Sequence, residues 1–89
     1  MALLQCMSSQ PKNIQFPQYR RYKNGLSYFK ILSELEFEEI KLIGNSAIKH
    51  KVVANQYPEK VVINDLLFNY TAFAEEIRED VYRTVERML

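Results

Sequence analysis

A β-hairpin over residues 18–32 is the feature that most constrains the fold of this chain. Asn24-Gly25 separates two segments, 18–23 and 26–32, that are rich in tyrosine, phenylalanine and aliphatic side chains. Asparagine and glycine accept the two positive φ angles of a type I′ turn, and aromatic residues favour a pleated surface. The sequence therefore predicts two antiparallel strands joined by a type I′ turn at Asn24-Gly25.

The next segment has two interpretations. Ser33 and Glu36 have the spacing of a capping box, which favours a short helix ending at Gly44. A strand is the alternative, because the apolar residues at 40–43 suit a sheet and 44–46 has the composition of a second hairpin turn. The helix is our first expectation and the strand our second.

Three further elements are expected towards the C-terminus. Residues 48–54 include Val52-Val53 and predict a strand. Residues 59–69 repeat apolar side chains at helical spacing after Pro58, which predicts a helix, with a strand at 61–63 as the alternative. The last segment predicts an amphipathic helix with one apolar face, formed by Ala74, Ile77, Val81, Val85 and Met88.

These elements predict an α+β fold in a single domain over residues 18–89. A small antiparallel sheet, made of the hairpin at 18–32 and the strand at 48–54, is expected to pack against the C-terminal amphipathic helix. With 89 residues, 47% hydrophobic and 26% charged, the chain has enough apolar material for one core. Residues 1–17 lack helical or strand periodicity and are expected to form a flexible N-terminal arm.

The residue types available limit catalytic and metal chemistry. The chain has one histidine, His50, and one cysteine, Cys6, too few for an ordinary zinc site. His50 lies between two lysines in an expected strand, so we expect a neutral structural imidazole in the core or at an interface. An enzyme with His50 and a carboxylate in a concave pocket is the less favoured alternative. Two glycines do not supply a phosphate-binding loop.

Paired carboxylates are the remaining candidates for acid–base chemistry or for binding a hard cation. Neighbouring residues in a helix point about 100° apart, so such pairs do not converge on one ion without another ligand. We expect solvated helix faces, with no catalytic residue, cofactor or metal. The pairs are Glu38-Glu39, Glu75-Glu76 and Glu79-Asp80.

A cytoplasmic location is expected, because a single cysteine forms no intramolecular disulfide. Residues 1–6 resemble the start of a secretory or lipoprotein leader. Their apolar run is shorter than the roughly 7–15 residues that such a leader requires, so we do not expect one. No stretch approaches the ~20 apolar residues of a spanning helix, so no membrane partner is expected. The net charge of +1 indicates neither nucleic acid nor membrane.

The hairpin interleaves aromatic and basic side chains across residues 16–30, and this gives a candidate binding surface. Sheet surfaces bind single-stranded nucleic acid in this way, because rings stack on bases while cations contact phosphates. An ordinary half-buried hairpin explains the same residues, since tyrosine is a favoured strand residue. The candidate residues are Tyr19, Arg20, Arg21, Tyr22, Lys23, Tyr28 and Lys30.

The chain resembles small uncharacterised bacterial proteins over roughly residues 19–67. The resemblance rests on the stretches YKNGLSYFKI at 22–31, EFEEI at 36–40 and YPEK at 57–60. It implies a compact bacterial cytoplasmic domain and assigns no site residue.

A non-enzymatic protein-interaction or assembly module is therefore the function that the sequence favours. A small sheet leaves edges to be covered, and six tyrosines with five phenylalanines are many for one core. We expect a protein partner or a homodimer, formed through a sheet edge or an apolar helix face. Single-stranded nucleic-acid binding by the hairpin is the alternative.

Overall fold

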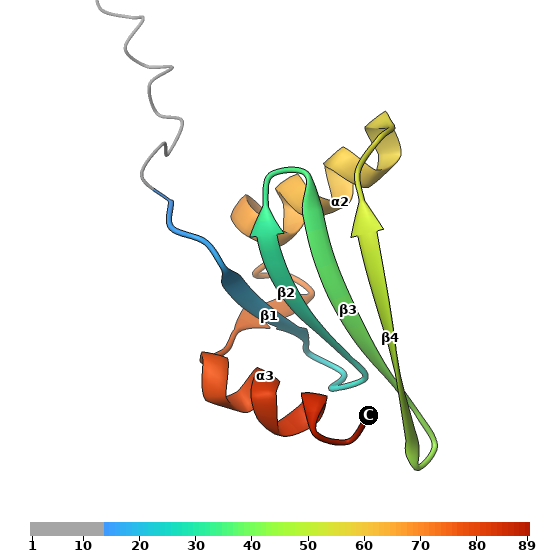
Figure 1. Ribbon diagram of the computed structural model, residues 1–89. Helices are drawn as coiled ribbons and strands as arrows, with labels where there is room; N and C mark the ends of the chain where they lie inside the picture. The colour runs from blue at the N-terminus through green and yellow to red at the C-terminus, as the bar shows by residue number, and fades with distance from the viewer. Residues whose placement is uncertain (1–13) are drawn as a thin grey trace, which may run out of the picture.

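The computed structural model describes residues 14–89, which form a sheet and two helices (Figure 1). The elements are β1 (Gln18–Tyr22), β2 (Ser27–Ser33), β3 (Glu36–Ile43), β4 (Ser46–Val53), α2 (Tyr57–Phe68), β5 (Ala74–Glu76) and α3 (Glu79–Glu86). The five strands lie in the order β4-β3-β2-β1-β5, and every neighbouring pair is antiparallel. The predicted α+β class with a C-terminal helix is confirmed, as are the strand at 48–54 and the helix at 59–69.

The β1–β2 hairpin is confirmed, but its predicted turn type is wrong. The Gly25 N–H donates to the Tyr22 carbonyl at 2.8 Å, so the turn is centred on Lys23 and Asn24. Gly25 has a φ of 75°, whereas no non-glycine residue of the described chain has a positive φ. The Asn24 side chain accepts the Leu26 N–H at 2.8 Å and so stabilises a local turn without a left-handed asparagine.

Residues 36–43 form strand β3, so the expected helix is wrong and its alternative is right. Ser33 Oγ accepts the Leu35 N–H at 3.1 Å, two residues on, and Ser33 is paired with Glu36 across a tight turn. A serine hydroxyl can close such a turn as readily as it caps a helix. Gly44, with a φ of 60°, makes the second tight turn, where Ile43 pairs with Ser46.

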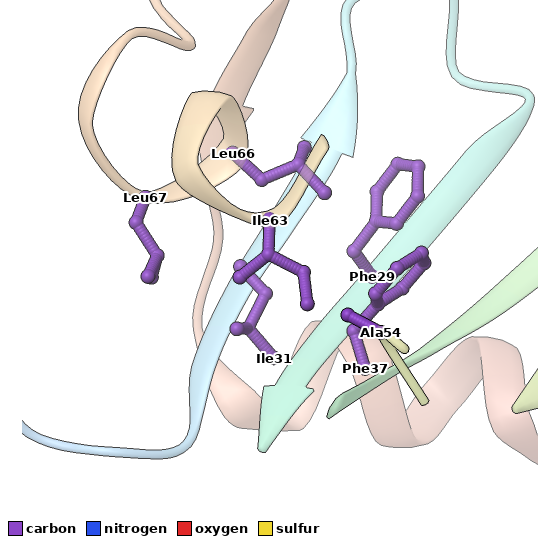
Figure 2. Close-up of a cluster of buried hydrophobic side chains, with 7 residues drawn as sticks. All are labelled: Phe29, Ile31, Phe37, Ala54, Ile63, Leu66 and Leu67. Carbon is purple, nitrogen blue, oxygen red and sulfur yellow. The ribbon is translucent and has the colours of Figure 1, made fainter. Parts of the chain in front are cut away.

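One face of the sheet is covered by α2. Phe29 and Ile31 of β2 and Phe37 of β3 pack against the inner face of the helix in the larger core cluster (Figure 2). The helix starts with a capping box, in which the Glu59 side chain accepts the Gln56 N–H, and proline occupies the first turn. The buried helix residues are Ile63, Leu66 and Leu67.

The opposite face is covered by α3. Ile40 of β3 packs with Tyr82 and Val85 of α3 in a second cluster. The predicted apolar face is only partly right, because Ala74 belongs to β5 and Met88 is exposed. The sheet therefore has a helix on each face, and not only the predicted C-terminal one.

The packed chain begins before β1. Ile14 and Phe16 lie half-buried against the α2 cluster. Residues 1–13 of the predicted arm, including Cys6 and the leader-like start, lie outside the described residues. Neither helix within residues 14–89 has the length and apolar character required to cross a bilayer.

Candidate interaction surfaces

The structure divides the candidate hairpin residues between the two faces of the sheet. Strand alternation places Arg20 and Tyr22 on the α2 face, together with Phe29. The same alternation places Tyr19, Arg21 and Tyr28 on the α3 face. The candidate residues therefore do not share one surface.

The α2-face members are used inside the fold. Arg20 is 3% exposed, donates from Nε to the Leu66 carbonyl at 2.9 Å, and lies 4.3 Å above the ring of Tyr70. The ring of Tyr22 packs edge-on against Phe29 at 4.8 Å, and burial raises the pKa of its hydroxyl. These contacts attach α2 and the chain after it to the sheet.

The α3-face members also have partners within the chain. The Tyr19 ring lies 5.4 Å from Tyr82, and burial raises the pKa of Tyr19. Arg21 donates from Nε to Glu75 at 2.7 Å, which joins β1 to β5. Its guanidinium lies 5.9 Å from the Tyr28 ring. Stacking rings and phosphate-binding cations are thus engaged in packing, which weakens the nucleic-acid alternative.

The two lysines of the candidate set lie apart. Lys23 is exposed in the turn, and its backbone N–H donates to the Phe73 carbonyl at 2.9 Å. Lys30 is half-buried on the α3 face. Neither extends a continuous basic surface along the hairpin.

His50 is exposed on β4, so the core position is wrong and, of the two expected positions, only the interface is left. The pairing register places it on the opposite face from Lys49 and Lys51, as alternation predicts, with Glu39 across from it. An exposed imidazole on an outer strand lacks the enclosed setting that the alternative enzyme requires.

The paired carboxylates do not converge, and the expected solvated helix face is wrong for Glu38-Glu39 and Glu75-Glu76, which lie in strands β3 and β5. Glu38 and Glu39 are consecutive in a strand and point to opposite faces. Glu79 pairs with Arg83, and Asp80 pairs with Arg78. No group of three histidine, cysteine or acidic side chains that can hold a metal ion is found within residues 14–89.

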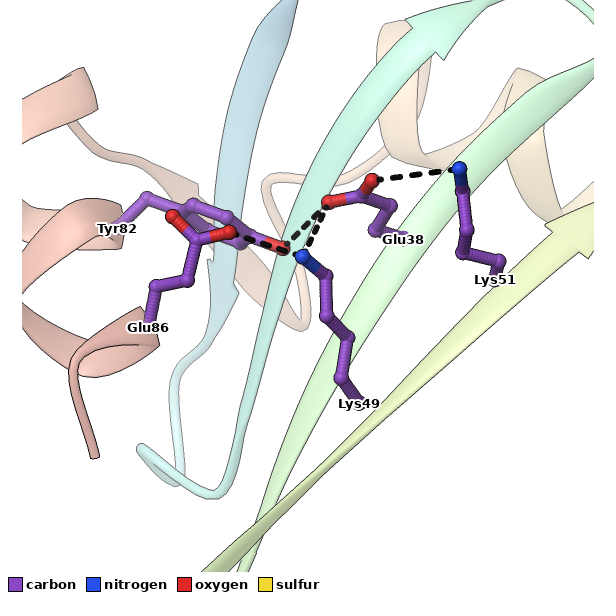
Figure 3. A network of polar contacts seen from close by, with 5 residues as sticks. All are labelled: Glu38, Lys49, Lys51, Tyr82 and Glu86. Carbon is purple, nitrogen blue, oxygen red and sulfur yellow. Dashed lines mark hydrogen bonds and ion pairs between the residues drawn. The ribbon is translucent and has the colours of Figure 1, made fainter. Parts of the chain in front are cut away.

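A buried carboxylate organises the polar contacts beneath α3 (Figure 3). Glu38 is 8% exposed and lies 3.3 Å from Lys49 Nζ and 4.0 Å from Lys51 Nζ. Tyr82 donates to Glu38 at 3.4 Å, and Lys49 donates to Glu86 at 2.9 Å. The network therefore joins β3, β4 and α3.

The charges of this network stabilise one another. The hydrogen bond to Lys49 lowers the pKa of Glu86, and the same bond raises the pKa of Lys49. Burial, followed by the charge of Glu38, raises the pKa of Tyr82, which keeps the hydroxyl protonated as a donor. Sequence reasoning missed this network because its members are distant in the chain, and the closest signal was the lysine spacing around His50.

An open depression of about 460 Å³ lies on the α2 face, at the end of the sheet that α2 leaves uncovered. Its base includes Ser27, which donates to Glu39 at 2.9 Å. Leu26 and Ile43 at its rim are each 52% exposed. The only carboxylate of its lining is thus already bonded, so the depression offers little unpaired polar chemistry.

The outer face of α2 carries an exposed stripe with three apolar members and one polar member, Asn64. We call it the α2 stripe and define it as Tyr57, Val61, Asn64 and Phe68. Tyr57 is 77% exposed, Phe68 42% and Val61 36%. A hollow of about 370 Å³ lies beside the first three members. Helix geometry places the stripe roughly 135° around the helix from the buried residues. The helix is therefore apolar on two sides, although the sheet contacts only one.

No family model, curated protein or solved structure matches this chain.

Proposed function

We propose that the protein is an assembly module that forms a homodimer through the α2 stripe. The observation that supports this proposal is an apolar outer face on a helix whose inner face already supplies the core. A helix that serves only to cover a sheet is expected to carry polar residues on its outer face. Contiguous exposed apolar side chains are typical of protein contact sites.

The spacing of the α2 stripe suits a second copy of the same helix. Its members are separated by four, three and four residues, which is a heptad-like seam and is symmetric about its centre. Two such helices related by a two-fold axis and running antiparallel would place Tyr57 of one copy beside Phe68 of the other. Val61 would lie beside Asn64 of the second copy. Each apolar residue thus gains a neighbour without any change of fold.

Adjacent valines on α2 allow a matched test. Val61 lies in the stripe, whereas Val62 lies about 100° around the helix, and the two are 36% and 40% exposed. We expect Val61→Asp to raise the dimer dissociation constant about tenfold or more, because association would bury an unpaired carboxylate. Sedimentation equilibrium over a concentration series measures this change.

Val62→Asp is the control and is expected to leave the dissociation constant within about threefold of the original, as for a residue outside the contact. Two results would contradict the proposal. One is that the unmodified protein sediments with the molecular mass of a monomer at every concentration. The other is that Val61→Asp and Val62→Asp change the dissociation constant equally.

A further inference from the structure

Strand β4 is a terminal strand of the sheet, and its outer edge is open in the part of the chain that the structure describes (Figure 1). It is eight residues long, whereas the opposite terminal strand, β5, has three. Long open edges present unpaired backbone groups to other chains. The β4 edge is therefore the larger of the two sites for strand addition.

The hydrogen-bond pattern identifies which backbone groups face this edge. The Leu42 N–H donates to Leu26 of β2, so the even-numbered residues of β3 bond towards β2 and the odd-numbered ones bond towards β4. In the β3–β4 register, odd residues of β3 pair with even residues of β4. The outward-facing N–H and C=O groups on β4 accordingly belong to Ala47, Lys49, Lys51 and Val53.

The side chains of this edge are basic. Lys49, His50 and Lys51 are consecutive, and both lysines lie on the α3 face. Glu38 is shared between the two lysines. Lys49 also pairs with Glu86 at 2.9 Å, whereas Lys51 lies 4.0 Å from Glu38 with its side chain 63% exposed. Lys51 therefore has room for a second carboxylate.

The same charges oppose pairing of β4 with a second copy. Antiparallel two-fold registers centred on Lys49, His50 or Lys51 each place a lysine directly opposite a lysine. Like charges at directly opposed positions of a sheet are destabilising. The lysines thus disfavour self-pairing of the edge in these three registers and favour a strand of opposite charge.

We propose that the β4 edge binds an extended acidic segment of another protein, which adds to the sheet as an antiparallel strand. Backbone groups at the four odd-numbered positions supply the hydrogen bonds, and carboxylates two residues apart face Lys49 and Lys51. An apolar residue of the segment covers Val53, which is 54% exposed. This surface is separate from the α2 stripe.

The test uses a capped peptide, Val-Thr-Glu-Thr-Glu-Val-Thr, whose glutamates fall opposite Lys51 and Lys49 when its first residue pairs with Val53. Hydrogen exchange of the protein amides, followed by NMR, measures binding. At saturation, exchange at Lys49 and Lys51 is expected to slow about tenfold or more, whereas His50, already bonded to β3, changes little. A peptide with lysine in place of both glutamates is expected to have no effect.

A charge reversal completes the test. Lys51→Glu is expected to lower the affinity for the acidic peptide about tenfold and to allow the lysine peptide to bind. Val61→Asp protein is expected to bind the acidic peptide as the unmodified protein does, which separates this inference from the α2 dimer. Three results would overturn the proposal. They are unchanged exchange at Lys49 and Lys51, equal binding of both peptides, and tighter binding of a single-stranded oligonucleotide than of the acidic peptide. If Lys51→Glu does not fold, comparing the two peptides on the unmodified protein still tests whether the β4 edge prefers an acidic strand.

Discussion

Replacing Phe29 with alanine is expected to lower the free energy of unfolding by about 3–5 kcal/mol. The side chain is 1% exposed on β2, the central strand of the sheet, and its ring lies 4.8 Å from Tyr22 and 6.0 Å from Phe37. Truncation removes this apolar contact and leaves a cavity between the sheet and α2. Urea denaturation followed by circular dichroism measures the loss as a lower midpoint at an unchanged slope.

Leu35→Ala is the control for this substitution. Leu35 lies in the β2–β3 turn and is 52% exposed, so its truncation is expected to change stability by less than about 0.5 kcal/mol. Small domains are stable by only about 5–15 kcal/mol, so Phe29→Leu provides a milder variant if the alanine protein does not fold. Equal effects at Phe29 and Leu35 would show that the α2 cluster is not the core of the domain.

Replacing Tyr82 with alanine is the second substitution for which we expect a loss of about 3–5 kcal/mol. Tyr82 is 1% exposed and is the largest of the fully buried side chains. Its ring packs against Tyr19 at 5.4 Å and belongs to the cluster with Ile40 and Val85. Because α3 has few other buried residues, we expect NMR to show that α3 leaves the sheet while the α2 cluster is retained.

Tyr82→Phe separates packing from hydrogen bonding. It keeps the ring and removes only the hydroxyl, whose bond to Glu38 is long at 3.4 Å. We expect a loss of about 1 kcal/mol or less. If the phenylalanine and alanine variants were equally unstable, the network around Glu38 and not the ring would hold α3 in place.

Local turn chemistry explains which parts of the fold were predictable. Asn24-Gly25 marked the first hairpin correctly, because a turn there is compatible with several backbone types. It did not determine the turn type, and the observed turn is accompanied by a hydrogen bond that the Asn24 side chain accepts from the Leu26 N–H. Ser33 and Glu36 fit both a helix cap and a tight turn, and pairing of β3 with two strands decided between them.

The packing of the C-terminal helix against the sheet was predictable, but the residues of its inner face were predicted only in part. Val85 marked the inner face of α3 correctly, but Tyr82 was missed because tyrosine suits a surface as well as a core. Ala74 fitted the same helical spacing and yet pairs with Tyr22 in a strand. An edge strand of three residues is too short to give a periodic signal.

The candidate binding residues were chosen for their aromatic or basic side chains, whereas their roles depend on which face of the sheet each side chain lies on. Arg20 and Arg21 look equivalent in the sequence, but consecutive strand residues point to opposite faces. Arg20 is buried under α2, and Arg21 pairs with Glu75. The α2 stripe was not identified, because the apolar repeat that predicted the helix follows its buried side, which carries Ile63, Leu66 and Leu67.

Disulfide trapping tests most directly whether two α2 stripes pack against each other in antiparallel orientation. In a Cys6→Ser background, Tyr57→Cys protein is mixed with Phe68→Cys protein, oxidised gently and examined by mass spectrometry. The antiparallel dimer places these two positions side by side, whereas identical positions lie about 16 Å apart along the helix axis. We expect the mixed disulfide to form in large excess over both homodisulfides. Predominant homodisulfides, or a random mixture of all three, would contradict the proposed assembly.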